Sequence, residues 1–103
     1  MKNYIPVELW RDTYTNPQLS KAFTFVEKVP LSKIKIDKNL FSWQNKVSLS
    51  RVNFIVENFD IDFWMPILIS PNYFLLDGQH RLQVARKLGL KYIDAVIDNE
   101  RKL

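Results

Sequence analysis

The residues best suited to chemistry in this chain are five neighbours, Asp77-Gly78-Gln79-His80-Arg81. They follow the apolar pair Leu75-Leu76 and precede a stretch with helical spacing, so the sequence predicts a sharp turn from a strand into a helix. The first turn of a helix leaves backbone N–H groups without partners, and the helix dipole makes that end positive. The pattern therefore predicts a binding site for an anion such as a phosphate group.

Each side chain of this turn has a place in that prediction. Arg81 offers a permanent charge and a planar fork that suits phosphate oxygens, and His80, the only histidine, can donate whether neutral or charged. Gly78 would let a ligand approach the backbone without a Cβ in the way. Asp77 would cap the helix or hold His80 or Arg81 in place. The alternative is an ordinary Asp-Gly turn with a packed histidine and an arginine that faces water.

Hydrophobic spacing predicts the elements that must position this turn. Strands are expected at 29–37, 66–70, 73–76 and 91–97, and helices at about 48–59 and 78–88. Pro71-Asn72 separates the two middle strands and predicts a hairpin, and Gly89 stands where a left-handed helix cap belongs. The order predicts an α/β (α+β) fold, a compact domain over 27–103 with a small mixed sheet and flanking helices, after an N-terminal arm over 1–26.

Composition limits the available chemistry. The chain has 103 residues, no cysteine and one histidine, which excludes disulfides, thiolate metal sites and cysteine nucleophiles and argues against a histidine-ligated zinc site. Its longest apolar stretches are far shorter than the roughly 20 residues that a membrane span needs. No secretory signal follows Met1, so we expect a cytoplasmic protein without a membrane partner.

The net charge of +4 is unevenly distributed. Residues 1–52 carry nine Lys or Arg against four acidic residues, whereas residues 53–103 carry six against seven. A basic N-terminal half can attract DNA or a nucleotide. A solvated lysine-rich surface is the alternative interpretation.

Several segments, taken in order, resemble a known family. They are Lys28–Ile34, Pro66–Ile69, the box Gly78-Gln79-His80-Arg81, Lys87–Leu90 and Tyr92–Ile97. In this order they look like the ParB/sulfiredoxin-like domain, the N-terminal domain of ParB partition proteins and their relatives. The resemblance covers roughly two-thirds of the chain, from Val29 to Ile97. It implies a phosphate or nucleotide, ATP or CTP, held at the box.

The departures from the family pattern narrow this implication. Sulfiredoxin carries its catalytic cysteine where Gln79 stands here, so sulfiredoxin chemistry is excluded. ParB proteins that bind and hydrolyse CTP have a second arginine in place of His80, and only Pro66 matches their Gly-x-x-Gln-Pro box, so the choice of nucleotide stays open. The helix-turn-helix region of ParB follows this domain and is not part of this sequence, so we do not expect DNA binding by that route.

The resemblance also implies a basic residue from the connector or the next helix beside the box. Lys46 and Arg51 are the candidates, and Lys46 is preferred because it immediately precedes the helix. An exposed loop lysine is the alternative. Ser48 would donate to the phosphate or simply cap the helix, and Trp43 would stack on a base or fill the edge of the core.

Three functions remain open from the sequence. The first is a nucleotide- or phosphate-binding module in a DNA-related process, with a homodimer as an open possibility. The second is a nuclease, an NTPase or a small-molecule kinase that uses the same pocket with Mg²⁺. The candidate carboxylates show no paired spacing, so no catalytic residue and no metal ligand is assigned; they are Asp37, Asp60, Asp62 and Asp77. The third is a degenerate domain kept for contact with another protein.

Overall fold

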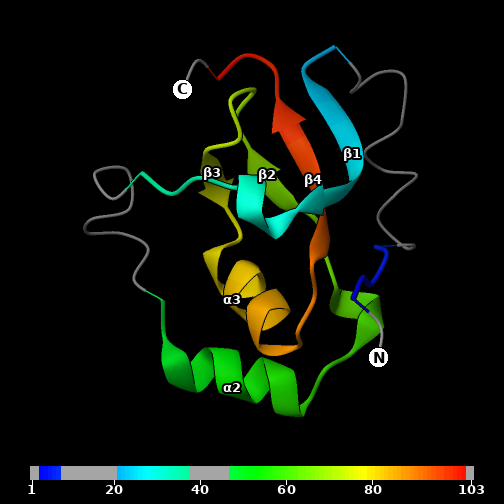
Figure 1. The fold of residues 1–103 in the computed structure, drawn as a ribbon, viewed down its shortest axis with the longest axis vertical. Coiled ribbons are helices and arrows are strands. Elements are labelled where there is room, and N and C mark those ends of the chain that lie inside the picture. The colour runs from blue at the N-terminus through cyan, green and yellow to red at the C-terminus, as the bar shows by residue number, and fades with distance from the viewer. Residues whose placement is uncertain (1–2, 8–20, 38–46, 102–103) are drawn as a thin grey trace.

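A mixed sheet forms the centre of the structure (Figure 1). The computed structural model describes residues 3–7, 21–37 and 47–101. Their four strands are β1 (Phe23–Pro30), β2 (Ile67–Ile69), β3 (Leu75–Asp77) and β4 (Tyr92–Asp98), in the order β1-β4-β2-β3. Strand β4 is antiparallel to β1 and parallel to β2, while β2 and β3 form the predicted antiparallel hairpin. The predicted α/β domain with a small mixed sheet is confirmed.

Two α-helices lie on one side of this sheet, and α3 lies between the sheet and α2 (Figure 1). Helix α3 (Gln79–Lys87) buries Leu82 and Ala85 completely, and Gly89 follows its end at a φ of 76°. Helix α2 (Leu49–Glu57) agrees with the predicted helix. None of the helices among the described residues is long and apolar enough to cross a membrane.

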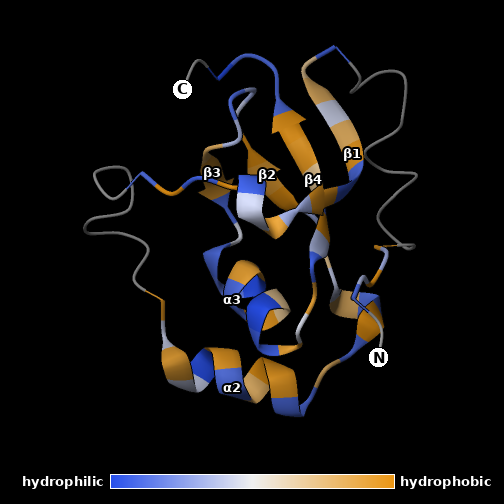
Figure 2. Ribbon diagram, viewed as in Figure 1, coloured by the Kyte–Doolittle hydropathy of each residue, from blue (hydrophilic) through white to orange (hydrophobic). Residues whose placement is uncertain are grey.

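The inner face of α2 is narrower than the sequence predicts. The spacing of Leu49, Val52, Val56 and Phe59 predicts that all four face the core, but Val52 is the one fully buried residue of α2 and Leu49 has 69% of its surface exposed. The reason is that α2 packs on α3 rather than on the sheet, and one helix covers only a narrow stripe of another. In Figure 2, α2 accordingly carries apolar and polar residues mixed along its length, while β2 and β4 are mostly apolar.

The first strand was predicted in the wrong place. The strand expected at 29–37 begins at Phe23 and ends at Pro30, where the chain turns into the 3-10 helix η1 (Leu31–Lys33). The alternation in 33–37 yields only one bridge, from Lys35 to Phe74. Pairing with β4 therefore decides where β1 lies, because that pairing extends back to Phe23.

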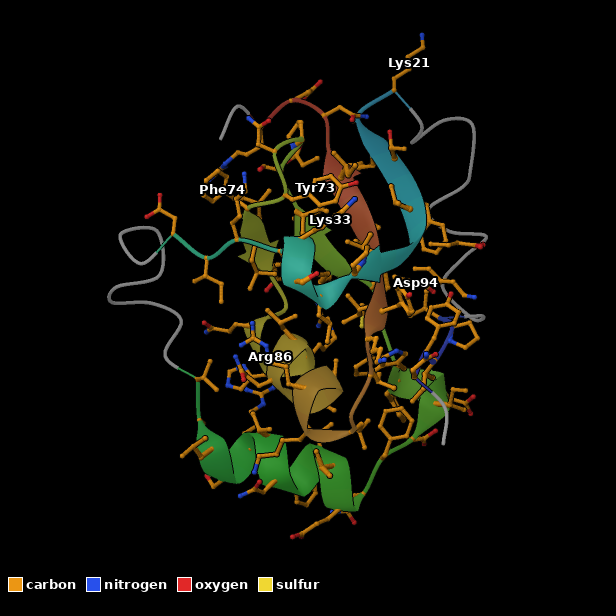
Figure 3. The ribbon with its side chains drawn as sticks, in the orientation of Figure 1. Lys21, Lys33, Tyr73, Phe74, Arg86 and Asp94 are labelled. Carbon is orange, nitrogen blue, oxygen red and sulfur yellow. The ribbon has the colours of Figure 1, made fainter. Side chains whose placement is uncertain are left out.

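Strand β1 crosses the boundary predicted between residues 26 and 27, and residues 3–7 also pack on the domain. Asp94 in the middle of β4 is fully buried, and Figure 3 shows it beside the N-terminal segment. Its carboxylate accepts hydrogen bonds from the Tyr4 hydroxyl (2.6 Å), the Val7 N–H (3.0 Å) and the Lys28 N–H (3.1 Å). Lys28 reaches it through a φ of 53° at an irregularity of the β1–β4 pairing. Buried charge is thus matched by donors from two segments.

Candidate functional site

The predicted turn lies between β3 and α3, as the sequence indicates. Asp77 ends β3, Gly78 is the N-cap of α3 with a φ of 102°, and Gln79 begins the helix. The Asp77 side chain does not cap the helix: its Oδ1 accepts a hydrogen bond from the N–H of Gly78 at 2.9 Å. Its Oδ2 lies 4.0 Å from Nη2 of Arg81, so the other expected role, holding the arginine, agrees with the structure.

Gly78 is needed by the protein's own packing. A Cβ at this position would lie 2.8 Å from Cγ2 of Ile67 in β2 and 3.0 Å from Nη2 of Arg81. The φ of 102° is also one that side-chain-bearing residues rarely adopt. The space expected for an approaching ligand is therefore occupied by Ile67 and by the guanidinium, which folds back over the glycine.

His80 connects the starts of the two helices. Its Nε2 atom accepts a hydrogen bond from the backbone N–H of Ser48 at 3.1 Å. An accepting Nε2 carries no proton, so this bond assigns the proton of the neutral ring to Nδ1. Ser48 is the N-cap of α2, and the N-terminal ends of α2 and α3 therefore meet at the imidazole.

The surroundings of His80 favour its neutral form. Partial burial lowers the pKa of His80 below its usual value of 6.5, and the positive charges of Arg51 and Arg81 lower the pKa further. Both arginines therefore act on the imidazole from different helices. The region around His80 is electropositive, and an anion placed there would be stabilised by both charges.

Ser48 is engaged as a helix cap. Its Oγ accepts from the N–H of Arg51 at 3.3 Å and lies 3.1 Å from Oγ of Ser50. This is the second of the two roles that the sequence left open. Arg51 itself is exposed on the first turn of α2. Ser48 therefore connects Arg51 and His80, because its Oγ accepts from the N–H of Arg51 and its own N–H donates to His80.

Arg81 lies between two hollows. One, of about 230 Å³, is lined mainly by aromatic residues of α2 and the segment that follows it; its lining includes Phe54, Phe59, Phe63 and Trp64. The other, of about 280 Å³, lies along β2 and also includes Asp77. His80 is not among the described residues that line either hollow. The imidazole and the guanidinium therefore share an electrostatic environment without lining one pocket.

The structure thus divides the predicted site residues into two groups. Ser48, Arg51 and His80 meet where the helices begin, while Asp77, Gly78 and Arg81 form the turn itself. Lys46 and Trp43 lie outside the described residues. Gln79 is half-buried at the first position of α3 and adds a backbone N–H to this end of the helix.

Metal ligands were not assigned from the sequence, and Mg²⁺ stays a prediction. Within the described ranges, no three side chains of the types His, Cys, Asp and Glu come close enough together to hold a metal ion.

Comparisons with solved structures identify this arrangement of strands and helices. The chain is similar to two structures of the N-terminal domain of a pNOB8-like ParB, at 26% and 24% identity and a TM-score of 0.55 each. It is also similar to the crystal structure of sulfiredoxin from Arabidopsis thaliana, at 27% identity and a TM-score of 0.56. The chain has the ParB/sulfiredoxin-like fold.

The extent of these matches differs between the relatives. The ParB matches cover 73% of this chain but only 30% and 28% of the ParB chains, whereas the sulfiredoxin match covers 78% of this chain and 86% of that chain. No protein-family model and no curated protein matches the chain. The comparisons therefore identify the ParB/sulfiredoxin-like fold and no ligand.

In this version of the ParB/sulfiredoxin-like fold, sequence reasoning missed the aromatic hollow beside Arg81. Phe54 and Phe63 are 65% and 77% exposed, and Trp64 is buried, with its indole Nε1 donating to the carbonyl of Ile5 at 3.1 Å. The signal was available, because four aromatic residues occur between positions 54 and 64. Helical periodicity could not assign them, since three of the four follow the end of α2.

Proposed function

We propose that the chain binds a phosphate group, carried by a nucleotide, where α2 and α3 begin. The observation that supports this most is the position of His80. Its Nε2 accepts a hydrogen bond from the N–H of Ser48 at the start of α2, and the charges of Arg51 and Arg81 lower its pKa. Two helix N-termini and two guanidinium groups act on the same small volume. A dianionic phosphate bound there would be attracted by these positive groups and would reduce the repulsion between them.

In the proposed complex each group has a distinct part. The Nδ1–H of neutral His80 is the donor left for the ligand, because Nε2 already accepts from Ser48. Arg51 and Arg81 would supply charge, and Arg81 would move from Asp77, whose exposed carboxylate lies 4.0 Å away. An ion pair of 4.0 Å with an exposed carboxylate contributes little to stability, so this pair does little to oppose binding of a phosphate.

The test is calorimetric titration of ATP and CTP into the wild type, Arg81→Ala and the matched variant Arg86→Ala. Arg86 is an exposed arginine in the last turn of the same helix, so its removal changes the net charge equally. We expect binding to weaken about tenfold or more in Arg81→Ala and to change little in Arg86→Ala. Equal losses in both variants would show that only net charge matters, and no binding by the wild type would refute the proposal.

The other two functions are outcomes of the same titrations. Turnover of the nucleotide that needs Mg²⁺ would identify an enzyme, with Asp77, 4.0 Å from Arg81, as a candidate carboxylate. No response to either nucleotide would favour a domain kept for protein contact. A role in a DNA-related process and a cytoplasmic location go with the first proposal and rest on the likeness to ParB domains and on the sequence.

A further inference from the structure

Two adjoining hollows surround η1, away from the start of α3. The first, of about 430 Å³, is lined by Ser32, Lys33, Lys35, Asn72 and Tyr73. Figure 3 shows Lys33 and Tyr73 next to each other on this surface.

The second hollow, of about 410 Å³, continues the first on the other side of η1. Its lining is formed by Pro30, Leu31, Ser32, Leu90, Lys91 and Tyr92. Ser32 lines both hollows, so together they form one continuous surface, which we call the η1 surface.

The η1 surface is positively charged. Lys33, Lys35 and Lys91 are all exposed, and the described residues that line the two hollows include no aspartate or glutamate. Lys35, which lines the first hollow, also makes a cation–π contact, its Nζ lying 5.3 Å from the centre of the Phe74 ring. Three ammonium groups without acidic neighbours in the lining attract anions.

The backbone at Tyr73, beside the first hollow, has an unusual conformation that hydrogen bonds hold in place. Tyr73 has a φ of 69°, which is rare for an aromatic residue. Hydrogen bonds on both sides hold it there: its N–H donates to the carbonyl of Ser70 at 2.9 Å, and its carbonyl accepts from the N–H of Lys35 at 2.8 Å. Strained backbone that is fixed in this way occurs preferentially at ligand-binding sites.

From these observations we infer that the η1 surface binds a single-stranded nucleic acid along its phosphodiester backbone. A single phosphate group would occupy one hollow, whereas two hollows that share Ser32 suit a ligand with successive charges. Tyr73 and Tyr92, one in each hollow, can contact unpaired bases, which a duplex keeps stacked inside. Lysines that follow a backbone beside aromatic residues are typical of binding without strong sequence preference.

This surface is separate from the site proposed for a nucleotide. Strand β3 has the hairpin turn with Tyr73 before its start and the Asp77–Arg81 turn at its end. Residues 77–81 are not among the described residues that line either hollow around η1. The inference therefore stands or falls independently of the nucleotide site.

The test is fluorescence anisotropy with a short labelled single strand that lacks a terminal phosphate. The wild type is compared with the triple variant Lys33→Gln, Lys35→Gln, Lys91→Gln and with a charge-matched control, Lys21→Gln, Arg86→Gln, Arg101→Gln. The control residues are exposed, and Figure 3 shows Lys21 and Arg86 well apart from Lys33. Three phosphate contacts predict a slope of about −2 for log K against log salt, and loss of all three predicts about tenfold weaker binding or more.

Three results would overturn the inference. They are equal weakening in the two triple variants, tighter binding of a duplex than of the single strand, and displacement of the strand by a mononucleotide. Arg81→Ala should leave binding of the single strand unchanged, which separates this surface from the nucleotide site. NMR of the wild type provides a measurement that does not depend on a variant. Adding the single-stranded nucleic acid should change the amide chemical shifts of residues 31–35, 72–73 and 91–92 and not those of residues 78–81.

Discussion

The side chain of Ile67 in β2 reaches to 2.8 Å from where a Cβ of Gly78 would stand. This contact means that the sheet and the start of α3 meet at a residue that has no side chain. The arginine of the box then closes over the same spot, 3.0 Å from the same Cβ position. Packing and the candidate site are therefore built on a single glycine.

Gly78→Ala should destabilise the protein by about 2–4 kcal/mol, because a methyl group there would clash with Ile67 and the φ of 102° would be strained. Urea unfolding measures the loss. Gly89→Ala is the control: this glycine is exposed and also has a positive φ, 76°, so it carries a similar backbone penalty of about 1–2 kcal/mol. Equal losses in the two variants would mean that the contact with Ile67 contributes nothing.

Lowering the pH should decrease the free energy of unfolding, because His80 is harder to protonate in the folded protein than in the unfolded chain. Its pKa is lowered in the folded protein by partial burial and by Arg51 and Arg81, so the unfolded chain takes up the proton first. Above the ordinary pKa of 6.5 His80 is neutral in both states, so its contribution to stability is fully present and does not change with pH; stability is lost as the pH falls below that value toward the lower folded pKa. Protonation also removes the acceptor that Nε2 offers to Ser48.

Urea midpoints measured between about pH 7 and pH 5 test this for the wild type and His80→Gln. The glutamine cannot titrate and keeps an oxygen that can accept from Ser48, so its stability should change less over this range. A variant with the same pH dependence as the wild type would show that other groups cause the loss.

Asp94 should be among the most costly residues to replace. Asp94→Ala leaves three donors, from Tyr4, Val7 and Lys28, without their acceptor inside the protein, and we expect a loss of about 3 kcal/mol or more. Tyr4→Phe removes one of the three bonds and should cost about 1–2 kcal/mol. Both are measured by urea unfolding, with Asp62→Ala, at an exposed position, as the control.

The same experiment can show where the network acts. Limited proteolysis should cut the N-terminal segment faster in Asp94→Ala than in the wild type, because two of the donors lie within residues 3–7. Equal rates of cleavage in the two proteins would mean that other contacts hold this segment.

Local pattern was enough to predict α2, α3, the β2–β3 hairpin and β4, since each is defined by its own spacing and turn residues. Asp77, Gly78 and Gly89 marked the boundaries of α3 with little error. Strand β1 was misplaced because its limits depend on pairing with β4, which lies about seventy residues away in the chain. The buried Asp94 was missed for the same reason: its three donors are 66 to 90 residues away.

The candidate site was predictable in its residue types and not in its geometry. The turn could be located from local sequence, because an apolar strand, Asp-Gly and a helical pattern follow one another. The hydrogen bond from Ser48 to His80 could not, because it joins residues 32 positions apart. Only the packing of α2 on α3 brings them together. Although His80 and Arg81 are neighbours in sequence, Arg81 lines both hollows beside α3 and His80 is not among the described residues that line either.

Ser48 gives a final prediction, because its two contacts involve different atoms. The Oγ caps α2 by accepting from Arg51, while the backbone N–H holds His80. Ser48→Ala removes only the Oγ, so it should cost about 1 kcal/mol of stability and leave His80 in place. Ser50→Ala, at an exposed neighbour, should cost less than about 0.5 kcal/mol.

Nucleotide titrations of the same two variants test whether the Oγ of Ser48 contacts the phosphate. If Ser48 serves only as a cap, its alanine variant should bind ATP or CTP as the wild type does once both are fully folded. An affinity about tenfold weaker with unchanged stability would mean instead that Oγ donates directly to the phosphate. The serine would then belong to the proposed binding site together with His80, Arg51 and Arg81.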